Sequence, residues 1–189
     1  RGTAPRDHHF PDQTTPTLFM MSNPLTGTSA EILKTGIAAV TEIDSRWSRC
    51  NIKSINLLAN VLHRQHALDQ GAKESILIRD SLVTEGAASN LFIVQHGTIL
   101  TPPKSNYLLP GVTRDLVLEL AQQHGMACRE AEINESSLQQ ADEIWVTSST
   151  KEIVPVTTLN QQPVADGKPG AITLQLHRHL QQFKQQFRS

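Results

Sequence analysis

Residues 46–54 read RWSRCNIKS, and a helical pattern of apolar side chains begins a few positions later. The apolar positions of this pattern are Leu57, Leu58, Val61, Leu62 and Leu68. Gly71 closes the run as a candidate C-cap. Lys53 therefore lies where the pattern starts, and the positive end of a helix dipole favours the neutral, nucleophilic form of an amine. The alternative is an ordinary solvated lysine beside an apolar helix.

Strand-like and helical runs alternate on both sides of this stretch. Strands are expected at Thr17–Met21, Thr35–Glu42, Ser75–Arg79, Asn90–Gln95, Thr98–Thr101, Met126–Ile133, Ile144–Thr147 and Glu152–Thr157. Further helices are expected from Gly111 to Gly125 and over Ser136–Asp142. The last segment carries one apolar stripe, formed by Ile172, Leu176, Leu180, Phe183 and Phe187. The pattern predicts an α/β or α+β chain with helices packed on a sheet.

Length and composition narrow the class of protein. The chain has 189 residues, which is enough for one well-buried domain. Its 17 Lys and Arg against 18 Asp and Glu leave no electrostatic footprint for nucleic acid or an anionic membrane. Cys50 and Cys128 form no CxxC or metal-ligand spacing, which favours a reducing, cytoplasmic setting. No apolar run approaches the roughly 20 residues that span a bilayer.

Glu85 is the first candidate beyond Lys53, in the segment VTEGAASN at residues 83–90. Three small residues follow it, and small residues let the backbone approach a flat ligand closely. A carboxylate at such a place could hold a proton on a heteroaromatic nitrogen. The alternative is a turn carboxylate exposed to water, and the local sequence does not decide between the two.

Two further segments could bind an anion. Leu109, Pro110 and Gly111 precede the second helix, whose free N–H groups, with the hydroxyl of Thr113, would suit a phosphate. The segment TSST at residues 147–150 offers hydroxyls and backbone donors between two strands. A plain Pro-Gly turn and a plain polar turn remain the alternatives.

Arg6 and His8 form a third kind of candidate site. At positions i and i+2 of an extended strand their side chains would share one face, where arginine can bind a carboxylate through two hydrogen bonds. The alternative is a pair of polar surface residues near the start of the chain.

The order and spacing of these segments resemble those of the fold-type IV aminotransferases. The resemblance runs from the Arg6 segment to about Pro155 and rests on four motifs, RWSRCNIKS at 46–54, EGAASN at 85–90, GVTR at 111–114 and TSST at 147–150. The Arg-x-His element at Arg6 and His8 resembles the substrate-carboxylate trap of the D-amino-acid aminotransferases. Ala87 and Ala88 depart from the pattern, because relatives often have serines there.

The resemblance implies a cofactor, pyridoxal 5'-phosphate (PLP), and a role for each motif. Lys53 would be the Schiff-base lysine and catalytic acid/base, and Glu85 would pair with the pyridine nitrogen. Leu109 would pack on the ring, and the phosphate would be bound by Val112, Thr113, Ser148 and Ser149. Thr150 is a further candidate for substrate binding in the same loop. Arg6 and His8 would hold the substrate carboxylate in the neighbouring subunit's site, which implies a homodimer.

The implied fold is the large cofactor-binding domain of this family, a barrel-like sheet flanked by helices, over residues 30–189. Residues 1–29 would be the last strand of a small N-terminal domain and a linker, with the rest of that domain absent. The implied reaction is transamination between a D-amino acid, such as D-alanine, and a 2-oxo acid, such as 2-oxoglutarate. The alternatives are aminodeoxychorismate lyase, a branched-chain L-amino-acid aminotransferase, or an inactive truncated domain.

Overall fold

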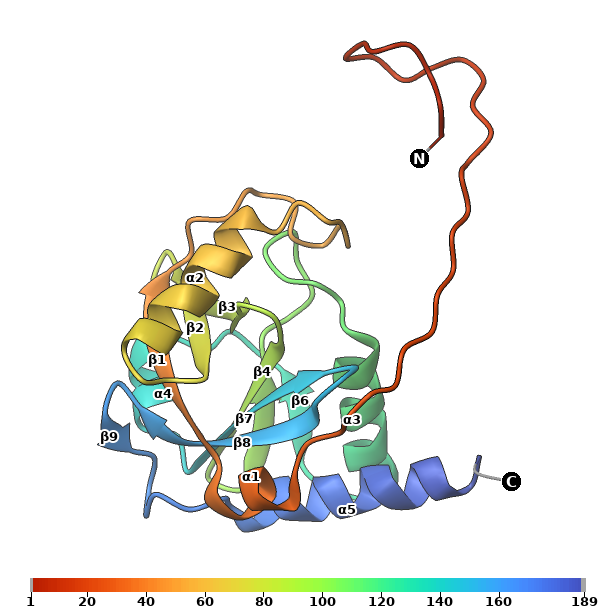
Figure 1. Cartoon of the computed structure of the whole chain (residues 1–189). Helices are drawn as coiled ribbons and strands as arrows, with labels where there is room; N and C mark the ends of the chain where they lie inside the picture. The colour runs from red at the N-terminus through yellow and green to blue at the C-terminus, as the bar shows by residue number, and fades with distance from the viewer. Residues whose placement is uncertain (1, 188–189) are drawn as a thin grey trace.

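The computed structural model describes residues 2–187, which form a curled sheet with helices packed around it (Figure 1). The strands are β1 (Ile37–Ile43), β2 (Glu74–Arg79), β3 (Leu82–Gly86), β4 (Asn90–Gln95), β5 (Thr98–Thr101), β6 (Cys128–Glu130), β7 (Glu143–Ser148), β8 (Glu152–Leu159) and β9 (Gln162–Pro163). The helices are α1 (Ala30–Thr35), α2 (Leu58–Asp69), α3 (Val112–Gln123), α4 (Glu135–Gln139) and α5 (Ala171–Gln185).

The sheet has the order β3-β2-β1-β8-β7-β4-β5-β6, and β9 is added beside β8. β1 is parallel to both of its neighbours, β2 and β8, whereas β7 is antiparallel to β4 and β8. In the β4–β7 pair, Asn90 lies opposite Thr147. This register places the start of β4 beside the end of β7, so two of the predicted site segments meet at one edge of the strands.

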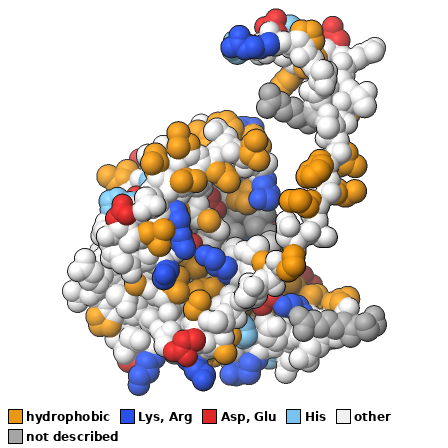
Figure 2. All heavy atoms as spheres, in the orientation of Figure 1, with side chains coloured by type: hydrophobic (Ala, Val, Ile, Leu, Met, Phe, Trp, Pro, Cys, Tyr) orange, Lys and Arg blue, Asp and Glu red, His pale blue; other side chains and the backbone are white. Residues whose placement is uncertain are grey.

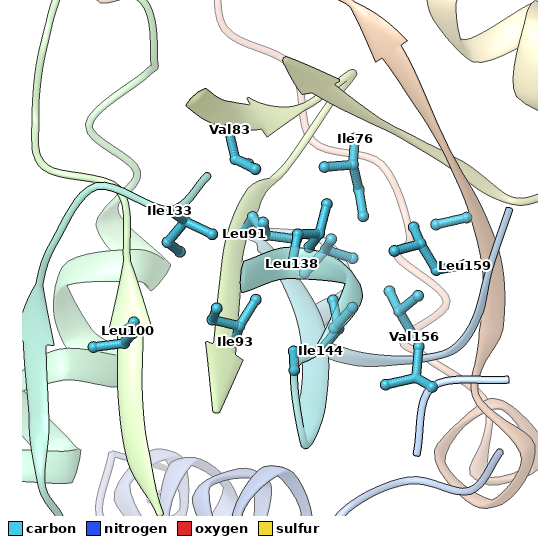
Figure 3. Packing of buried hydrophobic residues seen from close by; sticks show 14 of the residues in the cluster. Ile76, Val83, Leu91, Ile93, Leu100, Ile133, Leu138, Ile144, Val156 and Leu159 are labelled. Atoms are coloured by element: carbon cyan, nitrogen blue, oxygen red, sulfur yellow. The ribbon is translucent and has the colours of Figure 1, made fainter. Parts of the chain in front are cut away.

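Two apolar clusters hold the sheet, one on each face of β4. Successive side chains of a strand point to opposite faces, and the sequence of β4 alternates accordingly. Leu91 and Ile93 join the cluster enclosed by the curl of the sheet and by α4 (Figure 3). Phe92 and Val94 join a second cluster under α3 and α5. Each side chain fully buried in this way stabilises the fold by about 1.5–3 kcal/mol.

The outer cluster joins α5 to the sheet. Trp145 of β7 stacks on Phe92 with ring centroids 5.3 Å apart, and both side chains are fully buried. Leu176 and Leu180 of α5 pack in the same cluster, so the apolar stripe that the sequence indicates is the face that meets the sheet. The predicted α/β architecture of a barrel-like sheet flanked by helices is therefore confirmed.

The segment before α1 differs from its prediction. Residues 17–21, expected to form a strand, have no strand partner in the described chain, and the side chains of Leu18 and Phe19 are 80% exposed. Residues 2–29 run away from the body as an arm (Figure 1), whose apolar side chains stand out in Figure 2. The strand prediction was wrong because β propensity alone forms no strand where no neighbouring strand takes the hydrogen bonds.

Other differences concern the ends of elements. The expected strand from Thr35 begins at Ile37, because Thr35 is the last residue of α1. The strand expected over residues 126–133 is limited to β6, which pairs with three residues of β5. α2 ends at Asp69 with Gln70 as its C-cap, and Gly71 follows with a φ of 75°. The structure adds α1, β3 and β9, which the sequence patterns do not predict.

Across residues 2–187, no helix combines the length and apolar character needed to cross a membrane.

Candidate functional site

A cleft of about 910 Å³ opens on one side of the sheet. Its walls come from the loop before α2, the β3–β4 turn, the N-terminus of α3 and the β7–β8 turn. These segments carry eight of the ten site residues that the sequence predicts, Lys53, Glu85, Leu109, Val112, Thr113, Ser148, Ser149 and Thr150. A cleft of this size matches those that hold small molecules and cofactors in other proteins.

Lys53 contributes an exposed amine to the cleft. Its position differs from the expectation, because α2 begins at Leu58 and Lys53 lies five residues earlier, in a loop. The helix-dipole argument for a neutral amine therefore has no support at this position. What the fold supplies is access: the side chain stands where a ligand in the cleft can reach it.

Glu85 lies in β3 and is 5% exposed, so the alternative of a solvated turn carboxylate was wrong. Its Oε1 accepts a hydrogen bond of 2.5 Å from Arg46, and its Oε2 accepts from the backbone N–H of Leu109 at 3.0 Å and from Asn90 at 3.2 Å. Burial raises the pKa of Glu85 to about 7, and the nearby charge of Arg46 offsets this only in part. A cationic N–H donor in the cleft would favour the charged form.

Arg46 is shared between two carboxylates, which explains why its charge lowers the pKa of Glu85 less than burial raises it. Its Nε and one terminal nitrogen donate to the two oxygens of Asp44, both at 2.9 Å. Burial alone would raise the pKa of Asp44, but the hydrogen bonds from Arg46 outweigh it and hold that pKa below its ordinary value. Asp44 thus accepts two hydrogen bonds from the guanidinium group and Glu85 accepts one.

Asn90 links the carboxylate to the anion-binding segment. Its Nδ2 donates to Oε2 of Glu85 and also, at 2.8 Å, to the backbone carbonyl of Leu109. A Cβ on Gly111 would lie 2.1 Å from Oδ1 of Asn90, so only glycine fits there without moving the amide. The start of α3 and the position of Glu85 are therefore fixed by one buried side chain.

The N-terminus of α3 faces the cleft without a capping side chain. Its N-cap is Gly111, which can make no side-chain hydrogen bond, and Val112 and Thr113 follow in the wall of the cleft. Uncapped N–H groups and the helix dipole suit an anion. The predicted anion site at residues 109–113 thus has the expected local structure.

Two buried polar atoms in the cleft wall make no hydrogen bond within the described residues. Among residues 2–187, neither Oγ1 of Thr147 nor Oδ1 of Asn51 has a hydrogen-bond partner. Buried polar groups are nearly always hydrogen-bonded, and an orphan costs about 1–3 kcal/mol. Both residues line the cleft, so a polar ligand there would relieve this cost.

Arg6 and His8 are not brought to the cleft. Both are exposed, and they lie in bends of the arm rather than in a strand. Their predicted common face on an extended strand is therefore absent in the described chain. The arm carries them away from the body that holds Lys53 and Glu85 (Figure 1).

Asp44 lies outside the predicted motifs, whereas Arg46, Asn90 and Thr147 lie within them without an individual role in cofactor binding. The Asp-x-Arg spacing at 44–46 is a weak signal, because both side chains of such a pair face the same way when the chain is extended. The motifs contain Asn90 and Thr147 but do not show that the two residues lie opposite each other, since that follows from the pairing of β4 with β7.

Comparisons with known proteins agree with this geometry. The D-alanine aminotransferase of Bacillus licheniformis is 40% identical over 181 residues, which is 96% of this chain and 64% of that protein. The D-alanine aminotransferase of Listeria monocytogenes serotype 1/2a is 40% identical over 182 residues, 93% of this chain and 61% of that protein. The chain thus spans less than two thirds of the length of these relatives.

Solved structures share the fold. The branched-chain amino acid aminotransferase of Escherichia coli is 32% identical with a TM-score of 0.69, over 78% of this chain and 51% of that one. The T.th. branched-chain amino acid aminotransferase complexed with N-(5'-phosphopyridoxyl)-L-glutamate is 28% identical with a TM-score of 0.69, over 79% of this chain and 52% of that one. The family model of the class IV amino-transferases matches residues 1–159. This chain therefore belongs to the class IV aminotransferase family, the fold-type IV enzymes.

Proposed function

We propose that the cleft binds PLP and serves transamination between a D-amino acid, such as D-alanine, and a 2-oxo acid, such as 2-oxoglutarate. The observation that carries the proposal is the meeting of Lys53, Glu85 and the α3 N-terminus in one cleft, from segments far apart in the sequence. The 40% identity to D-alanine aminotransferases supports the choice of substrate. Two free cysteines, Cys50 and Cys128, are compatible with a cytoplasmic location.

The residues present fit the cofactor. The exposed amine of Lys53 would carry it, and the carboxylate of Glu85 would accept the pyridine N–H. The N–H groups at Val112 and Thr113, with Ser148 and Ser149, would bind the phosphate. The orphaned hydroxyl of Thr147 supports the fit, because a polar group in the cleft would provide the partner it lacks. When bound, PLP supplies an electron sink for the charge left at the substrate Cα.

Glu85 would keep the pyridine nitrogen of the cofactor protonated. Its pKa of about 7 reflects burial, and a cationic ring N–H would draw it to the charged form. Arg46, Asn90 and the N–H of Leu109 already fix both carboxylate oxygens. The carboxylate therefore needs little reorganisation to accept the ring proton.

Lys53 would act as the acid/base. Nζ would take the proton from the substrate Cα and hold it inside the cleft. Leu109 would pack on the ring, and Thr150 would contact the substrate. These assignments require no movement of the sheet, because each residue already lines the cleft.

Arg6 and His8 would bind the substrate carboxylate in the site of a second copy of the chain. Their exposure on an arm that leaves its own body supports such an exchange between copies (Figure 1). The proposal thus includes a homodimer. It also treats residues 1–29 as the linker and last strand of a small N-terminal domain, and residues 30–189 as the cofactor-binding domain.

Half-reactions test the substrate. The PLP-loaded protein is mixed with D-alanine alone, and the conversion of the cofactor to its amine form is followed by absorbance. Conversion by D-alanine and none by L-leucine is the expected result, with Lys53→Ala as an inactive control. Conversion by L-leucine but not by D-alanine would replace this proposal with a branched-chain L-amino-acid aminotransferase.

A further inference from the structure

A second cavity, of about 360 Å³, lies beside the main cleft. Arg46, Trp47, Asn56 and Asn60 line both cavities, and the second cavity alone is lined by Ser45, Leu58, Ala59 and Leu62. Just past the end of β1, buried and exposed side chains alternate along the chain. Asp44 and Arg46 are buried and Arg46 donates to Glu85, whereas Ser45 is exposed and lines the second cavity.

The hydroxyl of Ser45 belongs to a chain of three groups. Its Oγ lies 3.0 Å from Nε2 of His63, and Nδ1 of the same ring lies 2.6 Å from Oε2 of Glu42. A carboxylate can only accept, so Nδ1 carries the proton and donates it to Glu42. Nε2 of the neutral ring is then an acceptor, and the hydroxyl of Ser45 donates to it.

Ser75 fixes the carboxylate of Glu42 and the backbone of His63. Oγ of Ser75 lies 2.8 Å from Oε1 of Glu42 and 2.6 Å from the backbone carbonyl of His63. His63 is only 6% exposed, while Ser45 at the other end of the chain is exposed. A buried, oriented imidazole with an accessible hydroxyl on its free nitrogen is the arrangement that activates a serine for nucleophilic attack.

We propose that Ser45, His63 and Glu42 form a second site, which transfers acyl groups from carboxylic esters independently of the PLP cleft. Oγ of Ser45 would attack the ester carbonyl while its proton passes to Nε2 of His63. The C–O bond to the alcohol then breaks, and the alcohol leaves with that proton. A water molecule, deprotonated by His63, releases the acid and restores the hydroxyl of Ser45.

The cavity indicates the class of ester. Its small volume and the side chains of Leu58, Ala59 and Leu62 suit a short, uncharged acyl chain. Asn56 places an amide in the same wall, the kind of donor that can stabilise a developing oxyanion. p-Nitrophenyl acetate is therefore a suitable substrate, and an alkyl fluorophosphonate a suitable probe.

Labelling of the folded chain by the fluorophosphonate tests the proposal. The serine oxygen replaces fluoride on phosphorus, and mass spectrometry of the peptides is expected to find the adduct on Ser45. Ser45→Ala should lose both the label and acetate release, whereas Ser48→Ala, at another exposed serine, should keep both. Lys53→Ala should also keep both, which separates this site from the proposed aminotransferase.

Two further variants test the roles of His63 and Glu42. His63→Gln should slow labelling at least about 100-fold, the usual contribution of a general base. Glu42 is a positioning residue, and Glu42→Gln should slow labelling by on the order of 10⁴-fold, as loss of the orienting carboxylate does in such a triad, at unchanged melting temperature and with partial rescue by Glu42→Asp. The proposal fails if wild-type Ser45 takes no label under conditions that label a serine esterase. It fails equally if urea-unfolded protein labels Ser45 as fast as the folded chain.

Discussion

The carboxyl of Glu85 combines burial with three hydrogen bonds. Its pKa is raised from 4.5, the ordinary value, to about 7, with burial as the main cause. The folded chain therefore binds this proton more tightly than the unfolded chain does. The stabilisation is fully present below pH 4.5 and is lost as the pH rises through 7.

Glu85→Gln should remove this pH dependence. The free energy of unfolding of the wild type is expected to fall relative to that of the variant between pH 4.5 and 7, by on the order of 3 kcal/mol, since one pKa unit is about 1.4 kcal/mol. Urea unfolding at several pH values measures the difference. Asp44 does not interfere, because its lowered pKa acts below this window. Parallel pH profiles of the two proteins would contradict the assignment.

At the scale of single residues, the sequence predicts which side chains line the cleft. It predicts their local surroundings less well. The resemblance to a family indicates Lys53 and Glu85. The helix start expected at Lys53 lies five residues later, at Leu58. The burial of Glu85 depends on β3 pairing with β2, a contact between strands that no window of local sequence contains.

At the scale of elements, the start of α3 is set by the contact between Gly111 and Asn90. Gly111 has a φ of −71°, which alanine also adopts, so backbone strain plays no part. A Cβ there would displace the amide of Asn90, which lies 2.1 Å away and holds both Glu85 and Leu109.

Gly111→Ala should therefore weaken cofactor binding and lower the free energy of unfolding by about 1–3 kcal/mol, the cost of disturbing two buried hydrogen bonds. Gly27→Ala is the matched control, because nothing lies within 4 Å of a Cβ at Gly27. Urea unfolding and PLP titration measure the two effects. Equal values for the two variants would show that the amide of Asn90 moves at no cost.

Element types were predictable where a periodic pattern was long. The apolar stripe of α5 is the face that packs on the sheet. Successive side chains of β4 enter the apolar clusters on the two faces of the sheet in turn. The strand expected at residues 17–21 had the right composition but no neighbouring strand. β3 was missed because it is short and its residues are polar as well as apolar, so its burial comes from the sheet around it.

At the scale of the whole molecule, the arm and the exposed apolar side chains favour a second copy of the chain. Exposed apolar residues occur on the arm and around the start of α2, among them Phe19, Met20, Ile55 and Leu58. Figure 2 shows apolar side chains on the arm and over the upper part of the body. Patches of this kind mark protein interfaces.

Mixing two inactive variants tests whether Arg6 acts in the partner's site. Lys53→Ala and Arg6→Ala should each be inactive alone. Reassortment should restore about a quarter of the wild-type rate, since half of the dimers are mixed and each holds one intact site. Lys53→Ala mixed with Glu85→Ala should restore nothing, because both residues belong to one chain's cleft. No recovery in the first mixture would place Arg6 outside the partner's site.

The central claim is that Lys53 carries PLP in the cleft, and borohydride reduction tests it most directly. Reduction of the PLP-loaded protein, followed by peptide mapping, fixes the cofactor to the amine that held it. A pyridoxyl label on Lys53, absent from Lys53→Ala, is the predicted result. A label on another lysine such as Lys73 or Lys151, with Lys53 unmodified, would contradict the account.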